Sequence, residues 1–125
     1  FFKSGTTANS KGVTITHFSI CNAYYLSSIL IDFFTNNEDV ILLALTLICH
    51  ISTIACLIIS LYLSNYKLLL LCSKEVEPAL DAIQTYKCKL LFSLPFKLTY
   101  MINLAQIKKY DLSSLKFIST GGQCI

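Results

Sequence analysis

Apolar residues gather into short continuous runs that alternate with longer apolar segments. The short runs have the length of strands; they are residues 40–45, 67–72, 90–94 and 115–119. Residues 40–45 form a continuous aliphatic run, which is how a strand buried on both faces begins. The longer segments have the length and apolar density of helices; they are residues 19–34 and 54–62, the segment that starts at Pro78, and residues 96–105. Strand and helix in alternation predict an α/β fold with a largely parallel sheet.

Residues 40–63 carry no charged side chain and could cross a bilayer as one helix. Polar residues interrupt this stretch between Thr46 and Thr53, as a turn between a strand and a helix would require. We therefore predict a strand over residues 40–47, a helix that begins near Ser52, and no membrane span. A small membrane protein that spans the bilayer with this stretch is the alternative.

The composition indicates a piece of a protein interior. Hydrophobic residues make up 54% of the chain and charged residues 14%, a balance that excludes a disordered chain. Residue 1 is Phe, the only Met is Met101, and the sequence stops shortly after Gly122. We expect both ends to be truncations, so that any targeting signal lies outside the chain.

The distribution of lysines and cysteines argues against a nucleic-acid-binding protein and against a protein built on metal-bound or disulfide-bonded cysteines. The net charge of +3 comes from ten scattered lysines, whereas a nucleic-acid face would gather them. The cysteines lack metal-ligand spacing, and most lie inside apolar runs; they are Cys21, Cys49, Cys56, Cys72, Cys88 and Cys124. We interpret them as small buried side chains in a reducing compartment, which favours an intracellular protein of the cytoplasm or the peroxisome.

Small and hydroxylated residues form a continuous stretch near the start of the chain, from Ser4 to Gly12. Hydroxyls, backbone N–H groups and the Lys11 ammonium could bind phosphate oxygens there, and glycine lets the backbone come close. The stretch is neither a P-loop nor a dinucleotide fingerprint, because its glycines and its lysine are in the wrong order. A solvated turn is the alternative on composition alone.

The same stretch resembles the signature loop of the adenylate-forming superfamily, which includes acyl-CoA synthetases, 4-coumarate–CoA ligases and beetle luciferases. The family's loop is Ser-Gly-Thr-Thr-Gly-x-Pro-Lys-Gly-Val, and this chain has Ser-Gly-Thr-Thr-Ala-Asn-Ser-Lys-Gly-Val at residues 4–13. Further similarities follow in the family's order, at residues 39–50, 92–95, 110–115 and 120–122. The resemblance therefore covers nearly the whole chain as an internal part of the family's N-terminal domain, with the C-terminal domain absent.

The resemblance implies an ATP-dependent enzyme that converts a small carboxylic acid to an acyl-adenylate and passes the acyl group to coenzyme A. Mg²⁺ would accompany the phosphates. The residues implied to bind the ATP phosphates are Ser4, Gly5, Thr6, Thr7, Lys11 and Gly12. Those implied to line the acyl and adenylate pocket are His50, Gly121 and Gly122, and for His50 the alternative is a cap on the following helix.

The chain departs from the family's pattern at several positions. They are Ala8 and Ser10 in the loop, Thr46 and Thr53 around His50, and Gln123-Cys124 after the glycine pair. A left-handed backbone at Ala8 would cost about 1 kcal/mol, so a catalytically impaired pseudoenzyme of the same fold is an alternative. The family's ribose-binding Asp, metal-positioning Glu and catalytic Lys would lie beyond Ile125. We thus predict no catalytic residue and no metal ligand within the chain, and an isolated fragment without activity.

Overall fold

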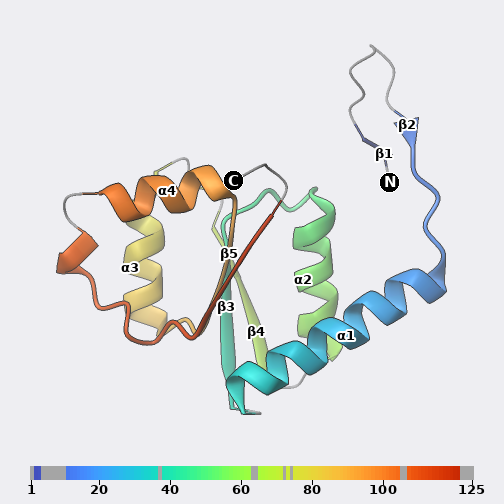
Figure 1. Cartoon of the computed structure of the whole chain (residues 1–125), viewed down its shortest axis with the longest axis horizontal. Helices are drawn as coiled ribbons and strands as arrows, with labels where there is room; N and C mark the ends of the chain where they lie inside the picture. Colours follow the sequence, from blue (N-terminus) through green and yellow to red (C-terminus); the bar gives the residue numbers. More distant parts are fainter. Residues whose placement is uncertain are drawn as a thin grey trace.

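The computed structural model describes residues 2–3, 11–36, 38–62, 65–71, 73, 75–104 and 107–121. These residues form a four-stranded sheet with helices on both faces and a separate two-stranded ribbon near the N-terminus (Figure 1). The predicted α/β class is confirmed.

The four-stranded sheet is parallel throughout and has the order β4-β3-β5-β6. Its strands are β3 (Val40–Ala44), β4 (Tyr66–Leu70), β5 (Leu90–Ser93) and β6 (Phe117–Thr120). Parallel neighbours need a crossover connection, and here each connection contains a helix. All four strands therefore end at the same edge of the sheet, which we call the carboxyl edge.

Two layers of helices cover the sheet (Figure 1). On one face lie α1 (His17–Thr35) and α2 (Ile51–Tyr62), and on the other lie α3 (Glu77–Tyr86), α4 (Pro95–Asn103) and the short 3-10 helix η1 (Ile107–Lys109). Strand β3 serves both layers, because Leu43 packs in the α3 cluster while Leu42 packs in the α2 cluster. This division explains why its sequence is apolar without alternation.

The uncharged stretch breaks as the sequence predicts. Strand β3 ends at Ala44 and helix α2 begins at Ile51, so the break between them, residues 45–50, overlaps the predicted interval. The strand is shorter than predicted, although the Leu45 N–H still donates to the Phe92 carbonyl at 2.9 Å. Among the residues that the structure describes, no helix is long and apolar enough to cross a membrane.

The prediction for the cysteines is only partly correct. Cys56 and Cys88 are buried, but Cys21 and Cys49 are exposed, and the other two lie outside the described residues. The prediction is wrong for Cys21 because its apolar neighbours in the sequence do not bury it. Much of α1 lies open to solvent, and several of its large apolar side chains are exposed.

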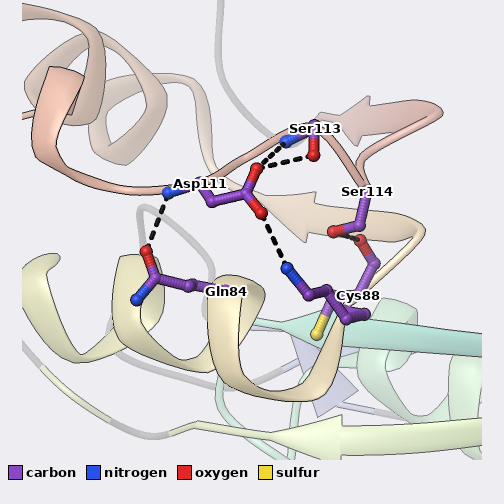
Figure 2. Close-up of polar contacts among 6 residues, drawn as sticks. Gln84, Cys88, Asp111, Ser113 and Ser114 are labelled. Atoms are coloured by element: carbon purple, nitrogen blue, oxygen red, sulfur yellow. Dashed lines mark hydrogen bonds and ion pairs between the residues drawn. The ribbon is translucent and has the colours of Figure 1, made fainter.

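A polar cluster around Asp111 ties the segment before β6 to the end of α3 (Figure 2). Its carboxylate accepts hydrogen bonds from the Ser113 hydroxyl at 2.6 Å and the Ser113 N–H at 3.1 Å, and it pairs with Lys87 at 2.7 Å. The Asp111 N–H donates to the Gln84 side chain at 2.8 Å. The Asp-Leu-Ser-Ser-Leu sequence is thus a structural connection in this chain.

Ser114 continues this connection to the start of β5. Its hydroxyl donates to the Cys88 carbonyl at 2.9 Å (Figure 2), and the Lys116 N–H donates to the Lys89 carbonyl at 2.8 Å. These two bonds bring residues 114–116 beside the residues that precede β5. Strand β6 therefore starts in register with β5, pairing Phe117 with Leu90.

We expect Asp111→Asn to lower stability near neutral pH and to lose this effect in acid. The hydrogen bonds from Lys87 and Ser113 hold the pKa of Asp111 well below its usual value. A lowered folded-state pKa contributes stability above the unfolded value of about 3.9, and this contribution is lost as the pH falls through the folded value. Urea denaturation at a series of pH values should show the variant and the wild type converging below about pH 4.

Asp81→Asn is the matched control, because Asp81 is exposed on α3 and forms no ion pair within the described structure. A difference between wild type and Asp111→Asn that does not depend on pH would contradict the prediction.

Candidate functional site

The carboxyl edge is the expected place for a ligand site. In open sheets of parallel strands, ligands bind outside the carboxyl ends of the strands. His50 lies in the turn after β3, and Gly121 follows β6 directly. Strand β5 separates these two strands, which therefore run about 10 Å apart.

Two buried threonines hold the turn that carries His50. The hydroxyls of Thr46 and Thr53 hydrogen-bond each other, and both residues are buried. The Thr53 N–H also donates to the His50 carbonyl at 3.0 Å. The end of β3 is thereby joined to the first turn of α2, with His50 fixed between them.

His50 caps α2 with its ring, as the alternative interpretation predicted. The Ser52 N–H donates to His50 Nδ1 at 3.4 Å, and the Ser52 hydroxyl lies 2.6 Å from the same nitrogen. Because a backbone N–H can only donate, Nδ1 is the acceptor, and the neutral ring carries its proton on Nε2. The ring is exposed, so its Nε2–H can donate to a ligand. The pocket role that the resemblance implies for His50 stays a prediction.

Lys97 brings a cation to the same edge. Its ammonium donates to the Leu45 carbonyl at 3.0 Å and to the Ser73 carbonyl at 2.9 Å, which links the chain after β3 to the chain after β4. A lysine has three donors, so one N–H remains beyond these two bonds. No sequence signal marked Lys97, because one lysine in a predicted helix is ordinarily a solvated residue.

A pocket of about 490 Å³, which we call the edge pocket, opens beside these groups. Its lining includes Leu47, His50, Ser73, Leu94, Phe96 and Lys97. An imidazole N–H and an ammonium in a largely apolar wall suit an anionic group such as a carboxylate or a phosphate.

A second pocket, of about 280 Å³, lies between the sheet and helices α1 and α2; we call it the face pocket. Its walls are mostly apolar, and they include Cys56, Ile59, Tyr66, Leu90, Phe92 and Phe117. Sequence analysis missed this pocket, since its residues come from separate elements and each looks like an ordinary core residue.

Two of the predicted phosphate-binding residues, Lys11 and Gly12, belong to the ribbon. Strand β1 (Phe2–Lys3) pairs antiparallel with β2 (Lys11–Gly12), and this ribbon stands apart from the large sheet (Figure 1). Lys11 and Gly12, which are exposed, are thus strand residues and not loop residues as predicted, because their backbones pair with β1. The other predicted residues Ser4, Gly5, Thr6, Thr7 and Gly122 lie outside the described residues.

Gly121 lies at the carboxyl edge, as the sequence predicts. A Cβ built on Gly121 would meet no atom within 4 Å, so the described residues leave room for a side chain there. Across the described part of the chain, no three His, Cys, Asp or Glu residues gather into a group that could hold a metal ion.

Comparison with known proteins identifies relatives over the full length of the chain. The model of the AMP-binding enzyme family matches residues 1–125. “4-coumarate--CoA ligase 3” of Arabidopsis thaliana is 30% identical over 122 residues, which are 96% of this chain and 22% of the ligase. “Luciferin 4-monooxygenase” of Photuris pensylvanica is 30% identical over 97% of this chain and 22% of its own length.

Solved structures agree with these sequence matches. The red-emitting luciferase from Phrixothrix hirtus superposes with a TM-score of 0.80 at 31% identity, over 98% of this chain and 23% of the luciferase. The luciferase-like enzyme from the mealworm Zophobas morio gives a TM-score of 0.76 at 28% identity, over 98% of this chain and 28% of that enzyme. The chain thus spans about 22% of the length of the curated relatives it matches.

Removing the second hydroxyl of the threonine pair should cost less than removing the first. Thr46→Val or Thr53→Val leaves the partner hydroxyl buried without a hydrogen bond, at a cost of about 1–3 kcal/mol in the free energy of unfolding. The double variant removes both polar groups, so its loss should be smaller than the sum of the single losses. Thr85→Val, at an exposed position of α3, is the control and should change stability by less than about 0.5 kcal/mol. Additive losses in urea denaturation would show that the hydroxyls are not partners.

Proposed function

Since the chain belongs to the AMP-binding enzyme family, we propose that its protein uses ATP to activate a carboxylic acid and then forms a thioester with coenzyme A. The observation that carries this proposal is the match to a CoA ligase over 96% of the chain. We also propose that residues 1–125 are a segment of the large N-terminal domain of such an enzyme. The free cysteines among the described residues favour a reducing compartment, in the cytoplasm or the peroxisome.

The reaction has two displacement steps. A carboxylate oxygen attacks the α-phosphorus of ATP, a new P–O bond forms, and pyrophosphate leaves with the electrons of the broken bond. The coenzyme A sulfur then attacks the acyl carbon, and AMP leaves as the C–S bond forms. Both steps depend mainly on positioning and on stabilising the charge that develops at phosphate and carbonyl oxygens.

Residues of this chain would supply part of that stabilisation. Lys11 and the hydroxylated stretch before it are proposed to hold the β- and γ-phosphates of ATP. The Nε2–H of His50 and the free N–H of Lys97 are proposed to orient the carboxylate and the adenylate in the edge pocket. Gly121 and Gly122 would leave room at the end of β6 for the adenine and the acyl chain.

Mg²⁺ would bind to the phosphates of ATP in the proposed site. It prefers oxygen ligands and usually keeps several waters alongside substrate phosphates, so a protein cage of acidic residues is not needed. When bound, the ion would neutralise charge on the departing pyrophosphate.

The second candidate is a catalytically impaired pseudoenzyme of the same fold. Ala8 and Ser10 in the hydroxylated stretch favour it, because they replace the residues that would shape the loop. Thr53 favours it less, since the structure gives this residue a role in holding the turn at His50. Pyrophosphate exchange into ATP by the full-length protein, over a panel of fatty and aromatic acids, separates an active enzyme from a pseudoenzyme.

Residues 1–125 produced alone should show no ligase activity. The chain spans about a fifth of its relatives' length, and a phosphate loop cannot by itself supply the stabilisation that adenylation requires. The measurement is pyrophosphate release with ATP, Mg²⁺ and the same acids. Release above the rate without protein would contradict the expectation.

Lys11→Ala in the full-length protein should slow adenylation and weaken ATP more than the acid. The lost charge faces only the nucleotide, so the expected loss is about 2–3 kcal/mol, or on the order of 30- to 150-fold in the ATP-dependent step. Kinetics at varied ATP and fixed acid measure this effect.

Lys108→Ala removes another exposed lysine, from helix η1, and serves as the control that should match wild type. Unchanged ATP dependence in Lys11→Ala, with activity intact, would mean that Lys11 is only part of the ribbon.

A further inference from the structure

The face pocket contains a buried hydroxyl without a partner. Tyr66 is 4% exposed, and its hydroxyl makes no hydrogen bond within the described structure. A buried hydroxyl left unsatisfied costs about 1–3 kcal/mol, so such groups are rare in folded proteins. Because Tyr66 also lines the face pocket, its hydroxyl is available to a molecule bound there.

Strand register shows how deep Tyr66 lies. Phe92 is paired with Ser119 near the carboxyl edge, and Leu90 is paired with Phe117 two residues earlier, which is about 7 Å deeper along the sheet. Tyr66 is the first residue of β4, so it lies near the opposite edge. The lining of the pocket therefore extends along the sheet from Ser52 and Ser119, near the carboxyl edge, to Tyr66 near the opposite edge.

The residues around Tyr66 exclude a charged group from this end. Burial raises the pKa of the Cys56 thiol to about 11 and also raises the pKa of Tyr66, so both are neutral near pH 7. The adjacent lining residues, Ile59 and Leu90, are apolar. A carboxylate would lose its hydration there without compensation, whereas a neutral oxygen could accept the Tyr66 hydrogen bond.

The same lining argues against a water molecule as the partner. A buried water usually makes two to four hydrogen bonds, and the side chains beside Tyr66 offer few. Two of the serines that line the pocket have other contacts: Ser27 donates to the Ala23 carbonyl at 2.7 Å, and Ser52 lies against His50. Ser119 lies near the carboxyl edge, away from Tyr66 at the start of β4. The Tyr66 hydroxyl is thus suited to donate to a ligand atom.

We propose that the face pocket receives the apolar body of the acid, and that Tyr66 selects acids with a neutral hydrogen-bond acceptor near the end remote from the carboxylate. This inference rests on the proposed function and narrows its substrate class. The carboxylate stays at the carboxyl edge near His50, where the polar groups lie. The remote oxygen, such as a ketone or an ether, accepts the hydrogen bond from Tyr66.

The test compares acids in matched pairs with the full-length protein. Each pair consists of a saturated fatty acid and the acid of equal length that carries one ketone oxygen near its far end. Wild type should prefer the keto acid by about tenfold in kcat/KM for pyrophosphate exchange, the usual effect of one hydrogen bond. Tyr66→Phe should abolish the preference and retain the rate with the saturated acid.

Tyr86→Phe makes the same chemical change at an exposed position of α3 and should keep the wild-type preference. Tyr66→Phe should also leave the urea midpoint without ligand unchanged or raised, because its hydroxyl has no protein partner to lose. Activity with an unaltered preference in Tyr66→Phe, or a lowered midpoint, would overturn the role of Tyr66 and leave the proposed function standing. Absence of exchange with every acid would overturn the proposed function and this inference together.

Discussion

The burial of β3 on both faces is the constraint on which the rest of the structure depends. Its residues Val40, Leu43 and Ala44 are almost completely inaccessible, and two parallel neighbours pair with it. A strand in that position must be apolar on both sides and needs a helix layer above and below. Parallel pairing in turn sends every connection through a helix, so all four strands end at one edge and the turns that follow them become neighbours.

The two edges of the sheet have different chemistry as a result. At the amino edge, Glu38 pairs with Lys89 at 2.6 Å and with Lys116 at 3.1 Å, which joins the residues before three strands. Exposed ion pairs of this kind contribute little energy but help to fix register. At the carboxyl edge, Lys97 donates to the Leu45 carbonyl, and the hydroxyls of Thr46 and Thr53 bond each other. His50 and Lys97 line the edge pocket there. Binding groups are therefore concentrated where the strands end.

The walls of the two pockets differ in their chemistry. The edge pocket presents His50 and Lys97, while the face pocket is apolar apart from its serines and the Tyr66 hydroxyl. The turn before helix α2 carries His50 into the lining of the edge pocket, and the helix itself carries Ser52, Cys56 and Ile59 along the face pocket. An acid has the same division between a charged head and an apolar body. The geometry of one strand, one turn and one helix thus suits that class of molecule.

The sequence by itself determined the fold class, because short apolar runs such as residues 40–45 alternate with helix-length segments along the whole chain. It also indicated the break before α2, since the polar residues from Thr46 to Thr53 suit a turn better than the middle of a membrane-spanning helix. It indicated the carboxyl-edge residues His50 and Gly121 through a resemblance of ordered motifs. These features are local, so a linear pattern can carry them.

Tertiary structure alone decided the remaining features. Nothing in the sequence distinguishes Lys97 from a solvated lysine, or Tyr66 from an ordinary core residue, until the sheet order brings their partners and their surroundings together. The exposure of Cys21 was likewise set by which part of α1 the sheet and α2 leave uncovered. Burial and partnership depend on contacts between residues far apart in the chain, and no local spacing encodes them.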